Sequence, residues 1–380
     1  EARADHQHLA LVGERRARHR RRRIDVGQIA GELALHRDVV GRAAAFLLVP
    51  AVALLLLTAL PSSAREVTDA AGRRVTVPDA PARVFAAGPP ASVLLYALAP
   101  EKMIGWVRVP KERDLPFLLP EVAALPELGR LTGKGGTLNL EALLAAKPDL
   151  IIDFGTVNET YIDLANQVQA QTGIPYVLID GSFANTPAAI RQLADVLGVG
   201  PRGEALAAYA EETFARVDAT LARVPSEARP RIYLARGPEG LESAAKGSIN
   251  AEILERTGAV NVTEGPQSGL VTTSPEQILA WNPDTIVTID RDFATTVTSR
   301  PEWSKVAAVA KGRIFLAPDA PFGFIDSPPS VNRLIGLHWA LHRLYPEDAT
   351  GDLKAEVARF YGLFYHVTPD ETAVARLLGE

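Results

Sequence analysis

Two segments of this chain share one pattern of hydrophobic and polar positions, 135 residues apart. The first covers residues 138–152 and the second residues 273–287. In each, a short helical pattern is ended by a Pro-Asp pair and followed at once by a β-branched run that predicts a strand. The matching positions are Glu141 with Glu276, Leu144 with Leu279, and Pro148-Asp149 with Pro283-Asp284. Pro-Asp before a strand is a common α/β connection, but a register held over about a dozen positions favours two lobes built alike.

The rest of the pattern alternates apolar runs with helical periodicity. A hairpin is predicted around Ala71-Gly72, and strands are predicted at residues 83–87, 104–107, 150–152, 176–179, 231–235, 285–289 and 313–316. Helices of ordinary length lie between these strands, and such alternation indicates parallel pairing. The predicted fold class is therefore α/β, with two Rossmann-like lobes, each around a central parallel sheet.

One long helix is predicted between the lobes. From Glu204 to Val224, apolar residues recur every three or four positions, and Pro225 follows. A helix of about 20 residues is on the order of 30 Å long. Because a rigid rod connects lobes differently from a flexible linker, we do not expect large hinge motion.

Charge divides the 380 residues unevenly. Residues 1–64 hold ten arginines and six acidic residues, which leaves 30 basic and 39 acidic residues in the remainder. An acidic body gives no reason to expect nucleic acid as a partner. The chain has no cysteine, so it has neither a disulfide nor a cysteine that could carry a lipid after export.

The amino-terminal pattern predicts export. An uncharged apolar run follows Arg42, and the small residues Ser62 and Ala64 precede Arg65 as in a signal-peptidase site. An uncleaved membrane anchor is the alternative, because the run approaches spanning length. The predicted organisation is an extension that is non-native or disordered (1–42), a signal peptide (43–64), an N-terminal lobe (65–203), a connecting helix (204–225) and a C-terminal lobe (226–380). Export without cysteine points to the periplasm.

The sequence contains no convincing match to a common enzyme motif. Residues 198–203 match G-x-G-x-x-G, but they follow a helix and contain Pro201, so they are interpreted as a helix C-cap and turn. No G-x-S-x-G or Walker A sequence occurs. His338 and His342 have a chelating spacing, yet no glutamate lies between them and their helix follows the last strand. We predict no enzymatic activity, no cofactor and no metal site.

Ligands of open α/β sheets bind at the carboxyl ends of the strands, where this chain has aromatic and arginine-bearing loops. Such side chains suit a bulky, partly apolar, anionic ligand. The candidate ligand-binding residues are Pro89, Trp106, Arg108, Phe154, Phe183, Arg236, Arg291, Phe293, Phe322 and Phe324.

From about Val67 to Leu344 the chain resembles periplasmic binding proteins of bacterial ABC importers for iron–siderophore, haem and cobalamin. The resemblance lies in the opening Val67–Arg73, in Pro81-Ala82-Arg83-Val84, and in the paired Glu/Pro-Asp segments. It implies a ligand held between two lobes, modest closure, and a permease and its ATPase as partners. It also implies that Glu141 and Glu276 dock onto arginines of the permease. We expect a monomer.

The resemblance leaves the ligand open. An iron complex, most often a siderophore, is the first expectation, with cobalamin, haem and molybdate as alternatives. Haem binders of the family often use Tyr or His as axial ligand, and Tyr161 and Tyr176 do not follow the expected loops, which argues against haem. A secreted α/β hydrolase is the alternative of another class, with Ser182 or Ser327 and His338 as the best pair available.

Overall fold

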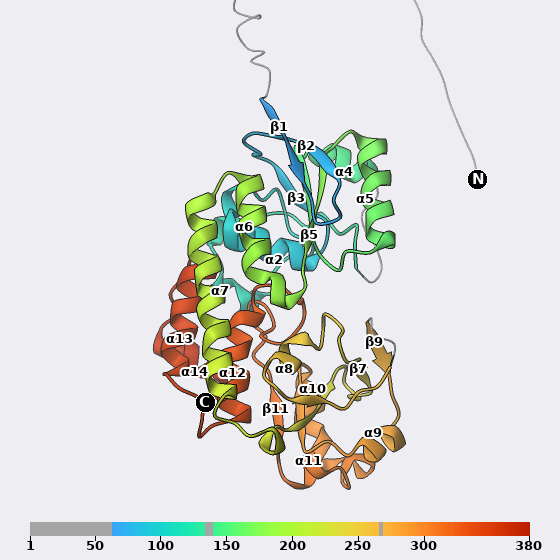
Figure 1. The fold of residues 1–380 in the computed structure, drawn as a ribbon, viewed down its shortest axis with the longest axis vertical. Coiled ribbons are helices and arrows are strands. Elements are labelled where there is room, and N and C mark those ends of the chain that lie inside the picture. The colour runs from blue at the N-terminus through green and yellow to red at the C-terminus, as the bar shows by residue number, and fades with distance from the viewer. Residues whose placement is uncertain (1–62, 134–139, 266–268) are drawn as a thin grey trace, which may run out of the picture. The chain divides into compact units, whose positions relative to one another are not determined.

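The first lobe is built on a three-stranded parallel sheet with its longest strand in the middle. The structure is a computed structural model that describes residues 63–133, 140–265 and 269–380 (Figure 1). Strand β4 (Leu150–Gly155) lies between β3 (Val84–Ala86) and β5 (Tyr176–Asp180). The first five residues of β4 are buried, as in a parallel strand covered by helices on both faces. The helices of this lobe are α2 (Pro89–Leu98), α3 (Pro120–Ala123), α4 (Leu140–Ala146), α5 (Glu159–Thr172) and α6 (Thr186–Leu197).

The predicted hairpin is confirmed at the start of the described chain. Strands β1 (Ala64–Thr68) and β2 (Arg74–Pro78) pair antiparallel, and Gly72 adopts the positive φ of 75° that the turn requires. The buried Asp69 carboxylate accepts from the Arg73 guanidinium at 2.7 Å, which stabilises the turn. A hydrogen bond from Ala70 N to Leu178 O fastens the hairpin to β5.

The second lobe repeats the parallel arrangement in a four-stranded sheet. Its strand order is β11-β10-β6-β8, and every neighbouring pair is parallel. The strands are β6 (Arg231–Ala235), β8 (Val260–Asn261), β10 (Thr285–Thr288) and β11 (Ile314–Leu316), beside an antiparallel pair of β7 (Glu242–Ala244) and β9 (Leu270–Thr272). The helices are α8 (Glu252–Arg256), α9 (Pro275–Trp281), α10 (Arg291–Thr296) and α11 (Ala307–Ala310). The predicted fold class is confirmed.

The two matching segments have the same local geometry. Helices α4 and α9 are followed by left-handed residues at corresponding positions, Lys147 with φ 49° and Asn282 with φ 43°. After each Pro, an aspartate accepts a hydrogen bond from the backbone at the start of a neighbouring strand. Asp149 accepts from Arg83 N at 3.0 Å, and Asp284 accepts from Arg231 N at 3.1 Å. The repeated sequence therefore encodes a repeated helix–turn–strand connection.

Helix α7 (Gly200–Leu221) connects the lobes, as predicted, but begins four residues earlier than the periodicity suggested. Pro201 lies in its first turn, where a missing N–H costs nothing. Gly198 ends α6 in a left-handed conformation, so the G-x-G-x-x-G match is a helix C-cap and turn. Helices α12 (Arg333–Leu344), α13 (Leu353–Phe360) and α14 (Glu371–Leu378) complete the chain, with a π-helical turn at Tyr361–Tyr365.

The carboxyl-terminal helices contact both lobes. Helix α12 packs on α7 and α8, and the π-helical turn packs on α2 of the first lobe. Tyr96 donates from its hydroxyl to Tyr365 O at 2.7 Å, and Ser330 donates to Pro90 O at 2.8 Å. The buried Arg333 guanidinium lies 4.4 Å from the Phe183 ring centroid. These buried contacts favour small rather than large movements between the lobes.

One predicted strand does not form. Residues 104–107 make only an isolated bridge, between Trp106 and Glu127. The reason is that Trp106 exchanges its backbone hydrogen bonds with Pro126 O and Leu128 N, both at 2.8 Å, so a loop rather than a sheet satisfies this segment. Short 3₁₀ turns occur at Pro100–Lys102, Glu112–Phe117, Phe183–Asn185, Ser226–Ala228, Val297–Ser299 and Pro301–Trp303.

The predicted extension (1–42) and all but the last two residues of the predicted signal peptide (43–64) lie outside the described residues. Within the described residues, no helix combines the length and apolarity that crossing a bilayer would require. The described residues from Ser63 to Glu380 belong to one compact unit, so the lobe boundaries at 203 and 226 stay predictions.

Candidate functional site

A cavity of about 760 Å³ lies between the two lobes. Its walls include residues that closely follow the parallel strands: Pro89 after β3, Thr156 after β4, Arg236 after β6, Ile289 after β10 and Pro318 after β11. The sequence predicted a site at the carboxyl ends of the strands, and the cavity lies there. Its size is that of a pocket for a bulky small molecule.

Six of the ten candidate ligand-binding residues line this cavity, and four do not. The six are Pro89, Trp106, Arg108, Phe154, Arg236 and Phe322. Of the other four, the three phenylalanines are buried in the hydrophobic cores. Phe183 packs edge-on against Phe214 at 5.4 Å, Phe293 packs against Trp303 at 4.8 Å, and Phe324 is fully buried.

These four positions correct the sequence-based site. A large aromatic ring gains more by packing into an available core than by facing water, and Phe183, Phe293 and Phe324 are buried in this way. Arg291 lines a separate cavity of about 650 Å³ instead, with its guanidinium 4.0 Å from Asp319. We remove these four from the proposed ligand contacts.

An aromatic cluster supports one wall of the cavity. Trp106 and Phe322 both line the cavity, and their ring centroids are 6.3 Å apart. Tyr96 lies behind them, 5.6 Å from Trp106 and 6.3 Å from Phe322. Trp106 also donates from Nε1 to Val122 O at 2.8 Å, which holds the indole in place. The wall is thus a preformed apolar surface.

The predicted arginines of the cavity differ in their pairing. Arg236 donates to Glu242 Oε1 at 3.0 Å and also contacts the buried Asp326 carboxylate, so its charge is already compensated. Arg108 is exposed, and no hydrogen bond or ion pair of its side chain is found among the described residues. Of the two, Arg108 is therefore the one placed to interact with a charged ligand.

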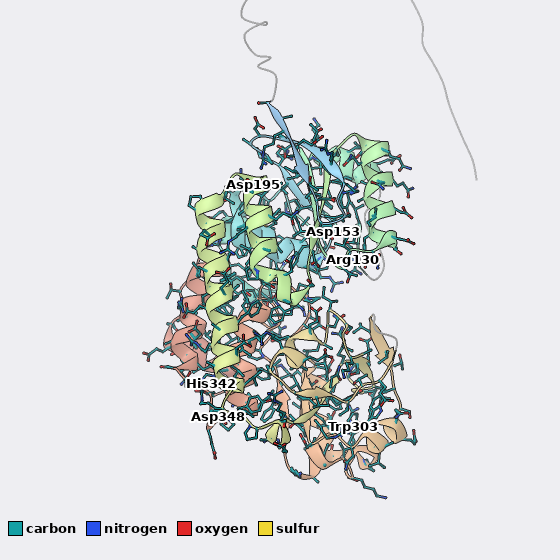
Figure 2. The ribbon with its side chains drawn as sticks, viewed as in Figure 1. Arg130, Asp153, Asp195, Trp303, His342 and Asp348 are labelled. Carbon is teal, nitrogen blue, oxygen red and sulfur yellow. The ribbon has the colours of Figure 1, made fainter. Side chains whose placement is uncertain are left out.

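The buried carboxylate of Asp153 lies in the cavity lining near the end of β4. Thr132 Oγ1 donates to one carboxylate oxygen and the Tyr176 hydroxyl donates to the other, both at 3.2 Å. Burial raises the pKa of Asp153 to about 6, although the two hydroxyls partly offset this effect. Figure 2 shows Asp153 and Arg130 in the first lobe, on the side that faces the second.

Sequence reasoning missed several polar residues of the cavity. Asp153 lies within the apolar run Leu150–Phe154. A charged residue among Leu, Ile and Phe was the sequence feature that could have indicated a functional position. Tyr161 was set aside with Tyr176, but Tyr161 lines the cavity because α5 begins shortly after β4. Tyr176 reaches the site indirectly, through its hydrogen bond to Asp153.

The residues considered for metal binding or catalysis are engaged elsewhere. His338 is buried with its Nε2 3.2 Å from Thr213 Oγ1, and His342 Nδ1 is 2.8 Å from the His338 carbonyl oxygen. Ser182 donates to Asp180 at 2.8 Å. Neither Ser182 nor Ser327 forms a hydrogen bond with His338 within the described chain. The arrangement therefore does not assemble the pair that a hydrolase would need.

The two candidate docking glutamates lie on matching short helices. Glu141 in α4 and Glu276 in α9 are both exposed. Three residues after each, a leucine is also exposed, Leu144 by 47% and Leu279 by 40%. Large aliphatic side chains with this exposure are few in the described chain. Each lobe thus presents an acidic and an apolar side chain on one helix face.

Comparison with known sequences gives a consistent match. The profile of the periplasmic binding protein family matches residues 119–321. The molybdate-binding protein MolA of Haemophilus influenzae is 26% identical over 347 residues, which cover 84% of this chain and 97% of MolA. A vitamin B12-binding protein of Pectobacterium carotovorum is 27% identical over 210 residues, which cover 54% of this chain and 71% of that protein.

Solved structures agree in fold. A solute-binding protein of an ABC transporter from Sulfurospirillum deleyianum has a TM-score of 0.76 and 29% identity, and covers 83% of this chain and 99% of its own. Molybdate-bound MolA of Haemophilus influenzae has a TM-score of 0.67 at 24% identity, and covers 80% of this chain and 99% of its own. At that lower identity the likeness concerns the fold alone.

Proposed function

The chain belongs to the periplasmic binding protein family, and on that premise we propose that it captures a bulky metal chelate, an iron–siderophore complex first, in the cavity between its lobes. Members of this family are the substrate-binding components of ABC importers, and this is the role of the protein. The periplasmic localisation expected from the sequence is confirmed. A permease and its ATPase are the partners of the proposed delivery step.

The size and lining of the cavity are the observations that support this ligand class. A volume of about 760 Å³ with an aromatic wall suits a bulky ligand with apolar surface. Its lining holds five basic and five acidic side chains, and Arg236 is paired within the protein. A balanced lining supports a ligand of low net charge, less anionic than the sequence suggested. Ferric hydroxamates and cobalamin have the required bulk.

Molybdate is the second candidate, for one reason. The molybdate-binding relative matches over 97% of its own length, whereas the vitamin B12-binding relative matches over 71%. A molybdate ion would occupy a small part of the cavity, and it would need hydrogen-bond donors and cations that converge on it. Arg108 is one such cation in the cavity.

Direct titration tests the ligand class. We would measure binding of a neutral ferric trihydroxamate, a ferric triscatecholate, cobalamin, haem and molybdate by calorimetry. We expect one tight ligand, with the bulky chelates preferred to molybdate. If none of these five compounds binds, the proposed ligand class is wrong.

A matched pair of variants tests the site. Arg108→Gln removes a charge from the cavity, and Arg291→Gln removes the same charge outside it. For a ligand with an acidic group we expect Arg108→Gln to weaken binding at least about fivefold, roughly 1 kcal/mol. Arg291→Gln should change it less than twofold. For such an acidic ligand, equal effects of the two variants would contradict binding in this cavity.

Docking of the permease by Glu141 and Glu276 is part of the proposal. Support comes from their matching positions, their exposure, and the exposed leucine beside each glutamate. Two such contacts, one on each lobe, would orient the protein on a partner that offers basic and apolar surface.

A further inference from the structure

Asp153 is a buried acid in the cavity lining, and among the described residues it forms no ion pair. Only 7% of the residue is exposed, yet it belongs to the cavity lining. Its two oxygens accept from the Thr132 and Tyr176 hydroxyls. Within the described chain, no Lys, Arg or His forms an ion pair with it, in contrast to Asp326, which lines the same cavity and contacts Arg236.

The described groups around Asp153 form no ion pair with its carboxylate. Tyr176 from β5 and Tyr161 from α5 face it, and both are themselves raised in pKa by burial. Arg73 lies behind Tyr176 but is paired with Asp69 at 2.7 Å. Arg130 lies nearby in the lining (Figure 2). The neighbouring β3 (Val84–Ala86) carries no titratable side chain.

A buried carboxylate without an ion-pair partner lowers the free energy of unfolding, but it can discriminate between ligands. A carboxylate taken out of water without a cation is destabilised, so it does not serve as a stabilising ion pair. A carboxylate offers about four acceptor positions, and the two hydroxyls each use one. The remaining lone pairs can accept N–H or O–H groups of a ligand, and the negative charge repels an anion.

We propose that Asp153 selects the ligand: its carboxylate accepts a hydrogen bond from an N–H or O–H group of a neutral ligand, and an anion binds only when this carboxyl takes up a proton. The inference rests on the proposed function of the cavity. The inference specifies which chemical groups the ligand presents to the first lobe. Amide and hydroxyl groups suit this position, and a bare oxyanion does not.

The test uses two probes, a neutral ferric trihydroxamate with amide N–H groups and molybdate as the anion. Affinities of the full chain are measured at pH 7.5 and 5.5 for wild type and Asp153→Asn. For wild type we expect molybdate to bind at least about tenfold more tightly at pH 5.5, because a required proton contributes up to about tenfold per pH unit above the pKa. Asp153→Asn should remove this pH dependence and bind molybdate more tightly at pH 7.5. It should bind the neutral chelate more weakly.

A control and a stability measurement separate selection from folding. Asp195→Asn removes a carboxyl of the first lobe outside the cavity lining, one that accepts from the Arg65 guanidinium, and it should leave the pH profile unchanged. Asp153→Asn should melt at the same or a higher temperature than wild type at pH 7.5, since it removes an uncompensated buried charge. A lower melting temperature would show that the carboxylate is needed for folding and would overturn the inference.

The outcomes distinguish the inference from the proposed function. If neither probe, nor cobalamin, haem or a triscatecholate, binds wild type at either pH, the proposed ligand class fails and the inference fails with it. If a probe binds and its pH profile is the same in wild type and Asp153→Asn, the role of Asp153 is wrong while the function stands. A wild type that binds only molybdate, without pH dependence, also overturns it.

Discussion

The Arg113 guanidinium of the first lobe donates two hydrogen bonds, of 2.6 and 3.2 Å, to the Asp319 carboxylate of the second lobe. Both residues line the cavity between the lobes. Their side chains are 45% and 34% exposed, so the pair contributes little to the free energy of unfolding. Because it joins the lobes at the cavity, its main effect is on their separation.

Arg113→Gln should widen the distribution of inter-lobe distances and change the free energy of unfolding by less than about 1 kcal/mol. The chain has no cysteine, so one introduced cysteine on each lobe can carry a spin label. Electron–electron distance measurements then report the separation, and urea unfolding reports stability. Arg65→Gln breaks an exposed pair within the first lobe, Arg65 with Asp195, and is the matched control. Identical distance distributions in wild type and Arg113→Gln would contradict the prediction.

Reversing both docking charges should abolish import without affecting ligand binding. The double variant Glu141→Arg, Glu276→Arg places positive charge where the permease is proposed to offer arginines, so association should weaken at least about tenfold. Uptake is measured with the permease and ATPase in vesicles, and ligand affinity by calorimetry.

The control for the docking test is Glu159→Arg with Glu302→Arg, which reverses one exposed glutamate on each lobe outside the matching helices. This control should keep full uptake. The docking assignment is wrong if the two double variants transport equally well.

Gly203→Ala should destabilise the protein, while Gly200→Ala should not. An added Cβ at Gly203 would overlap the Ala194 side chain, because α6 and α7 pack closely there. Overpacking of this kind costs about 1–3 kcal/mol. At Gly200, three residues earlier, no atom lies within 4 Å of an added Cβ, and alanine is expected to stabilise by about 0.4–1 kcal/mol. Urea unfolding of both variants measures the difference, and equal stabilities would show that the helices separate easily.

The repeated connections were predictable from the sequence because they are local. A residue before Pro-Asp ends each helix, and the aspartate reaches the neighbouring strand in both lobes, so Asp149 and Asp284 match in structure as they match in sequence. The predicted strand ends then indicated the sheet edge at which the cavity lies. Local sequence patterns determine where each strand ends. Because the ends of parallel strands lie at one edge of the sheet, the predicted strand ends locate that edge.

The direction of loop side chains was not predictable in the same way. Phe322 faces the cavity and Phe324, two residues later, faces the core, although their sequence surroundings look alike. Which ring is buried depends on helices that are distant in sequence, such as α12, whose Gly336 approaches the Phe324 carbonyl closely. Asp153 was missed because its role depends on its burial in the cavity lining and on the absence of an ion-pair partner among the described residues, and both are properties of the folded chain.

Buried His338 should make the protein less stable as the pH falls from 6.5 to 4. Burial lowers the pKa of His338 to about 4, from an ordinary value of 6.5, and the nearby Glu356 offsets only part of this effect. In this window the unfolded chain binds a proton that the native protein does not, so the free energy of unfolding decreases with falling pH. A difference of about 2.5 pH units corresponds to roughly 3 kcal/mol.

Comparison with His338→Gln isolates this contribution, because every other titrating group is common to both proteins. Glutamine keeps a polar group opposite Thr213 Oγ1, which lies 3.2 Å from His338 Nε2. Urea unfolding at pH 7.0, 6.0, 5.0 and 4.5 should show stability decreasing less steeply in the variant, so that the two curves converge as the pH falls. Parallel curves would mean that His338 is protonated in the native protein as readily as in the unfolded chain, and its burial would then have to be compensated by Glu356.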